Sequence, residues 1–106
     1  MRPQVSNVAI DCTDLDAMIG FWGALLEMKV TYRDENWVDL EAVSEGGPVL
    51  SFQLVPESKQ FKNRVHLDLG VPDIHAAGER ARELGATPEE EPMRNPDASF
   101  RVWLDP

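Results

Sequence analysis

The stretch RVHLDLGVPDIHAAGERARELGA, residues 64–86, decides the fold because it places a predicted strand directly before a capped helix. Apolar residues alternate with polar ones from Val65 to Leu69, which is the pattern of a half-buried strand. Asp73 stands at the position of a helix N-cap, and Gly85 stands at the position of a C-terminal cap glycine. We therefore predict a strand followed by a helix.

A second stretch near the start of the chain, residues 5–26, has the same layout. It begins with an alternating segment and continues with apolar residues at helical spacing. A shift of 59 residues superposes Asp14 on Asp73 and Asn7 on His66. Because helix cap and preceding strand coincide in both stretches, the chain looks like two copies of one strand–helix–strands unit.

The strands that complete each copy are predicted from alternating segments farther along the chain. They lie in KVTYRD, WVDLEAV and PVLSFQLVP in the first copy, and in SFRVWLDP in the second, where TPEEEPMRNPDA is a loop or a poor edge strand. The chain of 106 residues is then a single domain, with a first module at about 5–56, a linker at 57–63 and a second module at about 64–106. Each module alone has a small core, so we expect the paired sheets to curve around a shared cavity.

Composition excludes several classes of partner. A net charge of −9 argues against nucleic acid and against an anionic membrane, because both need a basic surface. No apolar run is long enough to span a membrane, and the first residues lack the apolar stretch of a signal peptide. The single cysteine, Cys12, excludes a disulfide within the chain. We therefore expect a cytoplasmic protein.

Four segments, in their order and spacing, carry a resemblance to a known family: VAIDCTDLDAMIGFWGALLEM, PVLSFQLVPE, KNRVHLDLGVPDIHAAGERARELGA and VWLDP. The chain resembles the vicinal oxygen chelate superfamily of glyoxalase I, bleomycin-resistance proteins and extradiol dioxygenases, and more closely its glyoxalase-like domain group. The resemblance implies an α+β fold in which paired βαβββ modules form a cupped mixed sheet with the helices outside. It also implies a homodimer. The last strand of the second module would start after Pro106, so we expect that strand to be missing.

The resemblance further implies a metal site in the cup, with ligands from the first and last strand of each module. The matching residues here are His66, Gln53 and Asn7, and the fourth position would fall beyond the last residue. A divalent ion would grip two neighbouring oxygens of a small oxygenated substrate as a Lewis acid, which predicts a lyase, an isomerase or a dioxygenase. Gln53 and Asn7 are neutral and weak ligands, so the cofactor is either one divalent ion or none.

Further residues are predicted to line the same cavity as a ligand-binding pocket: Asp11, Asp68, Ser51, Trp37, Trp103 and Arg101. A tryptophan can stack on a flat ligand, and Arg101 can receive an anion. The alternative function is therefore a non-catalytic protein of the bleomycin-resistance type, which binds or sequesters an aromatic small molecule without a metal. In that case His66 is a hydrogen-bonded histidine in a wet pocket. A third interpretation of His66 is a general acid or base that acts without a metal.

Overall fold

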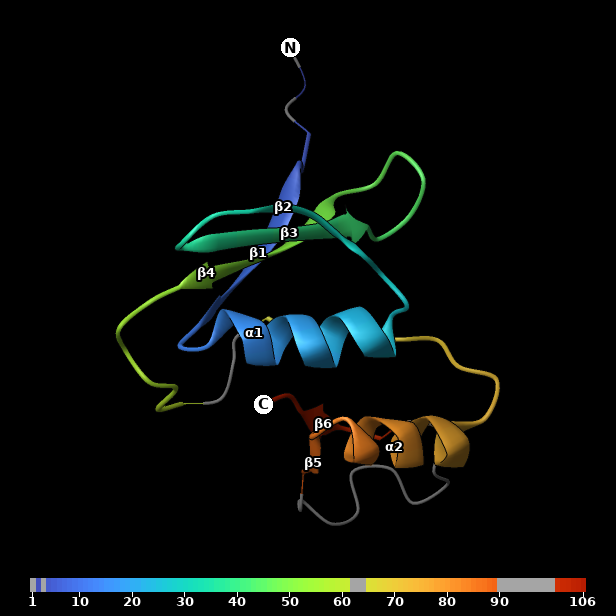
Figure 1. Cartoon of the computed structure of the whole chain (residues 1–106). Coiled ribbons are helices and arrows are strands. Elements are labelled where there is room, and N and C mark those ends of the chain that lie inside the picture. Colours follow the sequence, from blue (N-terminus) through green and yellow to red (C-terminus); the bar gives the residue numbers. More distant parts are fainter. Residues whose placement is uncertain (1, 3, 62–64, 90–100) are drawn as a thin grey trace. The chain divides into compact units, whose positions relative to one another are not determined.

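The computed structural model describes residue 2 and residues 4–61, 65–89 and 101–106. It has an α+β fold with a mixed sheet, as the sequence predicted (Figure 1). The chain divides into two compact units, Met1–Phe61 and Lys62–Pro106. No helix in the described ranges combines the length and the hydropathy that a membrane span requires.

The first unit contains a sheet of four strands. They are β1 (Asn7–Cys12), β2 (Val30–Arg33), β3 (Trp37–Ala42) and β4 (Val49–Leu54). Their order is β1-β4-β3-β2, with β1 parallel to β4 and the other neighbours antiparallel (Figure 1). All four strands lie where the alternation of apolar residues predicted them. In β3 the buried Val38 and Leu40 alternate with side chains of the other face, whereas all four residues of β2 are exposed.

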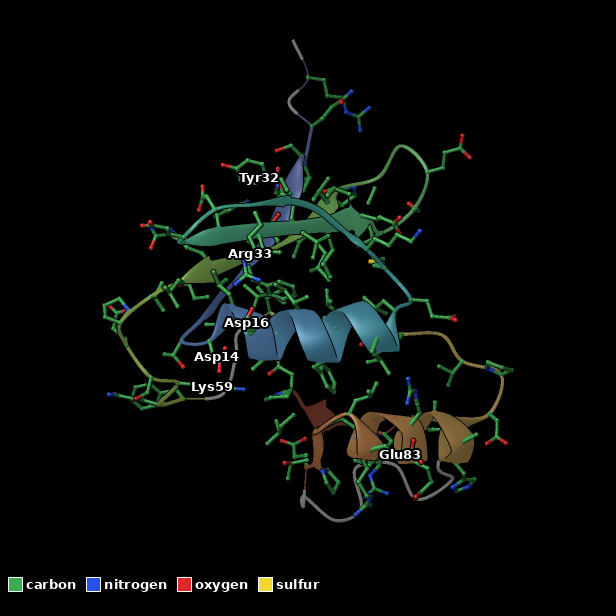
Figure 2. All side chains as sticks on the ribbon, viewed as in Figure 1. Asp14, Asp16, Tyr32, Arg33, Lys59 and Glu83 are labelled. Atoms are coloured by element: carbon green, nitrogen blue, oxygen red, sulfur yellow. The ribbon has the colours of Figure 1, made fainter. Side chains whose placement is uncertain are left out.

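One face of this sheet is covered by a helix that begins as α1 (Leu15–Met18) and continues as the π turn η1 (Ile19–Gly23) (Figure 1). The Asp14 carboxylate caps its start by accepting a hydrogen bond from the Ala17 N–H at 3.0 Å. On the side toward β2, Arg33 forms an ion pair with Asp16 at 2.8 Å (Figure 2). The predicted helix and its cap are therefore confirmed.

The core of the first unit lies between this helix and the sheet. Its buried apolar side chains are Leu15, Met18, Phe21 and Trp22 from the helix, and Val38, Leu40, Leu50 and Phe52 from the strands. Spacing at 3.6 residues per turn predicted Trp22 but not Phe21 for this face. The wider π turn changes the local spacing, and both aromatic rings are buried, with centroids 5.2 Å apart in an edge-to-face arrangement.

The second unit contains α2 (Ile74–Glu83) and a short antiparallel pair, β5 (Thr87–Pro88) and β6 (Trp103–Leu104). The Asp73 carboxylate accepts hydrogen bonds from the N–H groups of His75 and Ala76 at 2.9 and 3.1 Å. Gly85 has φ of 110°, the left-handed conformation of a C-terminal cap. The helix that the sequence predicted, with both of its caps, is confirmed.

The strand predicted at residues 65–69 is absent, which corrects the sequence analysis. This segment is not paired in either sheet, and the apolar side chains of Val65 and Leu69 are 70% and 44% exposed. Alternation alone does not make a strand when no neighbouring strand accepts its hydrogen bonds. The strand predicted in SFRVWLDP is reduced to β6 among the described residues. Most of TPEEEPMRNPDA, and the start of SFRVWLDP, lie outside the described ranges.

Candidate functional site

The face of the sheet opposite the core carries polar side chains from three neighbouring strands. We call it the polar face, and it consists of Asn7 and Asp11 on β1, Trp37 and Asp39 on β3, and Ser51 and Gln53 on β4. These residues alternate with the core residues of the same strands, so they share one side of the sheet. The strand register pairs Ser51 with Asp39 on one side and with Ala9 on the other, which places Ser51 at the centre.

A chain of three hydrogen bonds joins four of these side chains. The Asn7 amide nitrogen Nδ2 donates to Ser51 Oγ at 2.8 Å, and Ser51 Oγ donates to Asp39 Oδ1 at 2.6 Å. The indole Nε1 of Trp37 donates to the same carboxylate oxygen at 2.6 Å. Ser51 is fully buried, and its hydroxyl is both donor and acceptor here. The network therefore fixes the orientation of the Trp37 ring and of the Asp39 carboxylate.

Asp39 adds a negative charge to the polar face beside that of Asp11. Both of its hydrogen bonds arrive at Oδ1, and within the described part of the chain no basic side chain forms an ion pair with this carboxylate. Its second oxygen therefore keeps its capacity to accept hydrogen bonds. Asp39 and Trp37 are only half-buried, so a fixed negative charge and an indole ring lie next to each other and within reach of a ligand.

The residues predicted as metal ligands do not come together within the first unit. In the parallel register of β1 and β4, Asn7 lies beside Val49, and Gln53 lies beside Asp11. Asn7 and Gln53 share the polar face but are four positions apart along it, which is about 13 Å at 3.3 Å per residue. The side chain that Asn7 does reach is Ser51.

His66 lies in the second unit, in the segment that is not a strand. Its Nε2 is 3.5 Å from Asp68 Oδ1, and the two side chains are 81% and 94% exposed. Among the residues that the structure describes, no three histidine, cysteine, aspartate or glutamate side chains form a group that could hold a metal ion. The second unit also contains Trp103 and Arg101, whose guanidinium lies 5.6 Å from the centroid of the Trp103 ring.

Two titratable groups with shifted pKa values are Tyr32, on β2, and Asp34, in the turn that follows it. The backbone N–H of Asn36 donates to Asp34 Oδ1 at 2.8 Å, and this bond, followed by one from the Tyr32 hydroxyl, lowers the pKa of Asp34. The Tyr32 hydroxyl donates to Asp34 Oδ2 at 2.9 Å, and the hydrogen bond and the negative charge of Asp34 raise the pKa of Tyr32. Both side chains are exposed, so the ionisation of Tyr32 reports on its hydrogen bond with Asp34 at this edge of the sheet.

Asp39 was not predicted as a site residue from the sequence, although Trp37 and Ser51, whose side chains donate hydrogen bonds to it, were predicted. A signal was present, because Trp37 and Asp39 are two residues apart in an alternating strand and must share a face. Ser51 lies twelve residues after Asp39 in the sequence, and only the register of β3 against β4 places the two side chains next to each other. That register depends on the turn and on packing, which the alternation does not contain.

A family model described as a glyoxalase-like domain matches residues 7–106. The match covers nearly the whole chain, including the polar face and both helices. The chain therefore belongs to the glyoxalase-like domain family of the vicinal oxygen chelate superfamily. A comparison with curated proteins found no match.

Several solved structures have a similar fold. A glyoxalase/bleomycin resistance protein/dioxygenase family enzyme from Burkholderia phytofirmans is 19% identical, with 98% of this chain and 91% of that chain covered and a TM-score of 0.71. A hypothetical protein from S. aureus is 16% identical over 99% and 88% of the two chains, with a TM-score of 0.69. A bleomycin resistance determinant encoded on the transposon Tn5 is 18% identical over 83% and 78%, with a TM-score of 0.51. At these identities the likeness shows the fold.

Proposed function

We propose that this protein binds a small cationic aromatic molecule on the polar face and holds it without a catalytic metal. The observation that carries the proposal is the Asp39 carboxylate, fixed between the indole N–H of Trp37 and the hydroxyl of Ser51. A binding role of this kind is the bleomycin-resistance alternative predicted from the resemblance, and a bleomycin resistance determinant is among the structures with a similar fold. The proposed ligand is a small molecule, which is the kind of partner predicted from the sequence.

The ring of the ligand would stack on Trp37. The hydrogen bond from its Nε1 to Asp39 holds the indole in one orientation, so little side-chain entropy is lost when a flat ligand binds. An aromatic pair in offset or edge-to-face contact contributes about 0.5–1.5 kcal/mol beyond the area that it buries. The half-buried Trp37 is therefore suited to act as a preorganised stacking surface.

The positive group of the ligand would pair with Asp39. An amidinium or ammonium group donates charge-assisted hydrogen bonds, which are about twice as strong as neutral ones. Ser51 and Trp37 occupy Oδ1, so the ligand would be received by Oδ2. Asp11 and Gln53, which are exposed neighbours in the β1/β4 register, add acceptors on the same face. The net charge of −9 attracts a cation from solution.

A divalent-metal-assisted lyase, isomerase or dioxygenase is less well supported. Hard divalent ions in proteins are held by oxygen ligands at about 2.0–2.6 Å, and several ligands must converge on one point. Within the first unit, Asn7 and Gln53 are neutral amides at opposite ends of the β1/β4 pair and cannot converge. These two amides therefore give no support to a resident ion in this unit, and His66 is the residue on which any metal hypothesis depends.

The proposal is tested with a matched pair of probes in the presence of EDTA. Benzamidine carries an amidinium on a benzene ring, and benzoate has nearly the same shape with the opposite charge. We expect benzamidine to bind to the polar face and benzoate not to bind there. Asp39→Asn removes the fixed charge and should weaken benzamidine binding about tenfold, in line with the loss of a hydrogen bond to a charged group.

Glu45→Gln is the control for net charge, because Glu45 is exposed in the turn between β3 and β4. This variant should bind benzamidine as the wild-type protein does. The proposal fails if the two variants lose the same affinity, or if benzamidine binds only after a divalent ion is restored. The second result would return the search to metal-assisted chemistry with His66 as a ligand.

Two further features stay proposals: a homodimer, which the family resemblance implies, and a cytoplasmic location, which was predicted from the sequence itself. The dimer is checked by sedimentation velocity over a hundredfold range of protein concentration. A single sedimenting species with the mass of one chain at every concentration would contradict it.

A further inference from the structure

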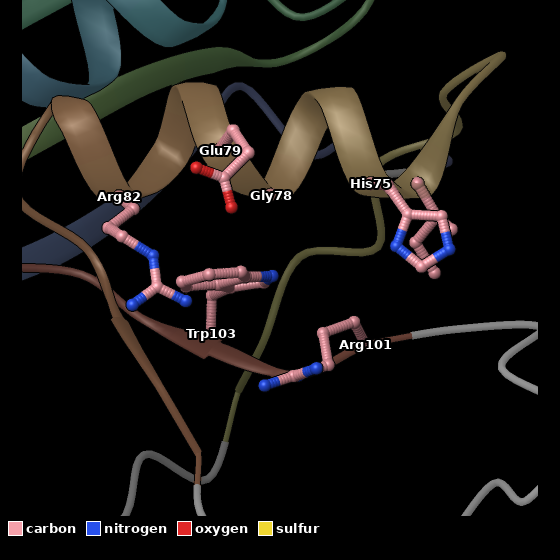
Figure 3. A pocket seen from close by; sticks show the side chains of 7 residues that line it. His75, Gly78, Glu79, Arg82, Arg101 and Trp103 are labelled. Carbon is pink, nitrogen blue, oxygen red and sulfur yellow. The ribbon is translucent and has the colours of Figure 1, made fainter.

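The second unit contains a hollow of about 110 Å³ between α2 and β6 (Figure 3). We call it the Trp103 hollow, and its lining residues are Ile74, His75, Gly78, Glu79, Arg82, Arg101 and Trp103. The hollow is large enough for a group of a few atoms, such as a carboxylate or a phosphate. It is lined by residues of the second unit alone, so it stands independently of the polar face and of the proposed function.

Trp103 is held in the hollow by its contact with α2. A Cβ atom added to Gly78 would lie 2.8 Å from Cζ2 of the Trp103 ring, so only glycine permits this approach. Glycine inside a helix costs about 1 kcal/mol relative to alanine. The buried Gly78 accepts that cost, and the ring of Trp103 lies directly against the helix (Figure 3).

Two arginines lie over the same ring. The guanidinium carbons of Arg82 and Arg101 are 5.5 and 5.6 Å from the Trp103 ring centroid, within the range of a cation–π interaction. A guanidinium that stacks on a ring keeps its N–H groups free along its edge, and it has five of them. The Trp103 ring therefore holds two guanidinium groups beside one hollow, and their N–H groups can still donate hydrogen bonds to a ligand.

The charge environment distinguishes these arginines from others in the chain. Arg33 pairs with Asp16 at 2.8 Å, and Arg80, on the same helix as Arg82, lies 3.7 Å from Glu83. Among the described residues, neither Arg82 nor Arg101 forms an ion pair with an acidic side chain, although Glu79 lines the hollow. The C-terminal end of the helix dipole favours Arg82 at its position, but it does not account for Arg101, which lies two residues before β6.

We infer that the Trp103 hollow is a binding site for a small oxyanion, a carboxylate or a phosphate group, held by the guanidinium groups of Arg82 and Arg101. Two arginines beside one hollow provide the planar donor edges that carboxylate and phosphate oxygens accept. His75, which also lines the hollow, offers a ring N–H as a further donor. Glu79, which also lines the hollow, repels negative charge and therefore disfavours the more highly charged anions.

The test is a titration of isotope-labelled full-length protein with inorganic phosphate in one arm and benzoate in the other, followed by nuclear magnetic resonance. The chain has three tryptophans, so three indole N–H signals are present, each assigned by a tryptophan-to-phenylalanine variant. We expect the Trp103 signal to shift saturably with at least one anion, while the signal of the buried Trp22 stays in place. The arm that saturates identifies the anion as phosphate or carboxylate.

Three charge-matched variants locate the site. Arg82→Gln and Arg101→Gln should each weaken the anion about tenfold, because each removes a charged hydrogen-bond donor. Arg80→Gln removes the same charge two residues earlier on the same helix and should leave the affinity for the anion within twofold of the wild-type value. The inference is overturned if the Trp103 signal does not respond to either anion, or if Arg80→Gln weakens binding as much as the other two variants.

Discussion

Substitution of Ser51 by alanine is expected to destabilise the first unit, because Ser51 connects the two halves of the polar network. Its hydroxyl donates to Asp39 at 2.6 Å and accepts from Asn7 at 2.8 Å, and the residue is fully buried. The Asn7 side chain is exposed, so water replaces its lost bond at almost no cost. The half-buried Asp39 carboxylate loses one of two fixed donors. A hydrogen bond to a charged group contributes about 1.5–3 kcal/mol, and Trp37 continues to donate.

We therefore expect Ser51→Ala to lower the free energy of unfolding by about 1.5–2 kcal/mol. The measurement is urea denaturation, in which the midpoint should fall while the slope stays constant. Ser58→Ala, at an exposed position, is the control and should change the free energy by less than about 0.5 kcal/mol. The double variant with Asp39→Asn should cost less than the sum of the two single changes. Equal effects of Ser51→Ala and Ser58→Ala would refute the argument.

Three other predictions follow from the structure. Gly78→Ala should lower the free energy of unfolding by about 1 kcal/mol, because overpacking of the new Cβ, 2.8 Å from the Trp103 ring, outweighs the gain in helix propensity. Gly20→Ala, whose new Cβ would have nothing within 4 Å, should raise the free energy of unfolding by about 0.5–1 kcal/mol. Thermal unfolding of both variants tests these two signs. Asp34→Asn should move the ionisation of Tyr32, the single tyrosine, to lower pH in an ultraviolet absorbance titration. Because the pKa of Tyr32 is raised by folding, the associated stabilisation is present below the pKa of the unfolded chain and is lost as pH rises through the pKa of the folded protein. An unchanged midpoint of the Tyr32 titration in Asp34→Asn would show that Asp34 does not raise this pKa. Elemental mass spectrometry of protein purified without chelator should find far less than one divalent ion per chain; one ion per chain, lost in His66→Ala, would make His66 a metal ligand.

The local elements of the fold could be predicted from the sequence because their causes are local. The caps at Asp14 and Asp73 and the glycine at Gly85 act within a few residues, and the structure confirms all three. The four strands of the first unit were likewise predicted, because alternation marks the side chains that enter the core. Phe21 was missed because the π turn departs from the 3.6-residue period.

Features that depend on strand pairing could not be predicted in the same way. The segment at residues 65–69 alternates as a strand does, but alternation does not reveal whether a neighbouring strand accepts its hydrogen bonds. The partnership of Ser51 and Asp39 likewise depends on the register of β3 against β4. Asn7 and Gln53 were paired as metal ligands through the family resemblance, and the register of β1 against β4 separates them by four positions. A network on a sheet face is a property of the register, which a single sequence leaves open.

The central claim is that the polar face binds a cationic aromatic ligand without a metal. The most direct test is a nuclear magnetic resonance titration of the labelled protein with benzamidine in EDTA, in which the three indole N–H signals are followed separately. The account predicts a saturable shift of the Trp37 signal, accompanied by the side-chain amide of Asn7 and the backbone amides of Asp39 and Ser51, with the Trp22 signal unchanged. A Trp37 signal that stays in place while benzamidine shifts other parts of the chain, or no shift at all, would contradict the claim.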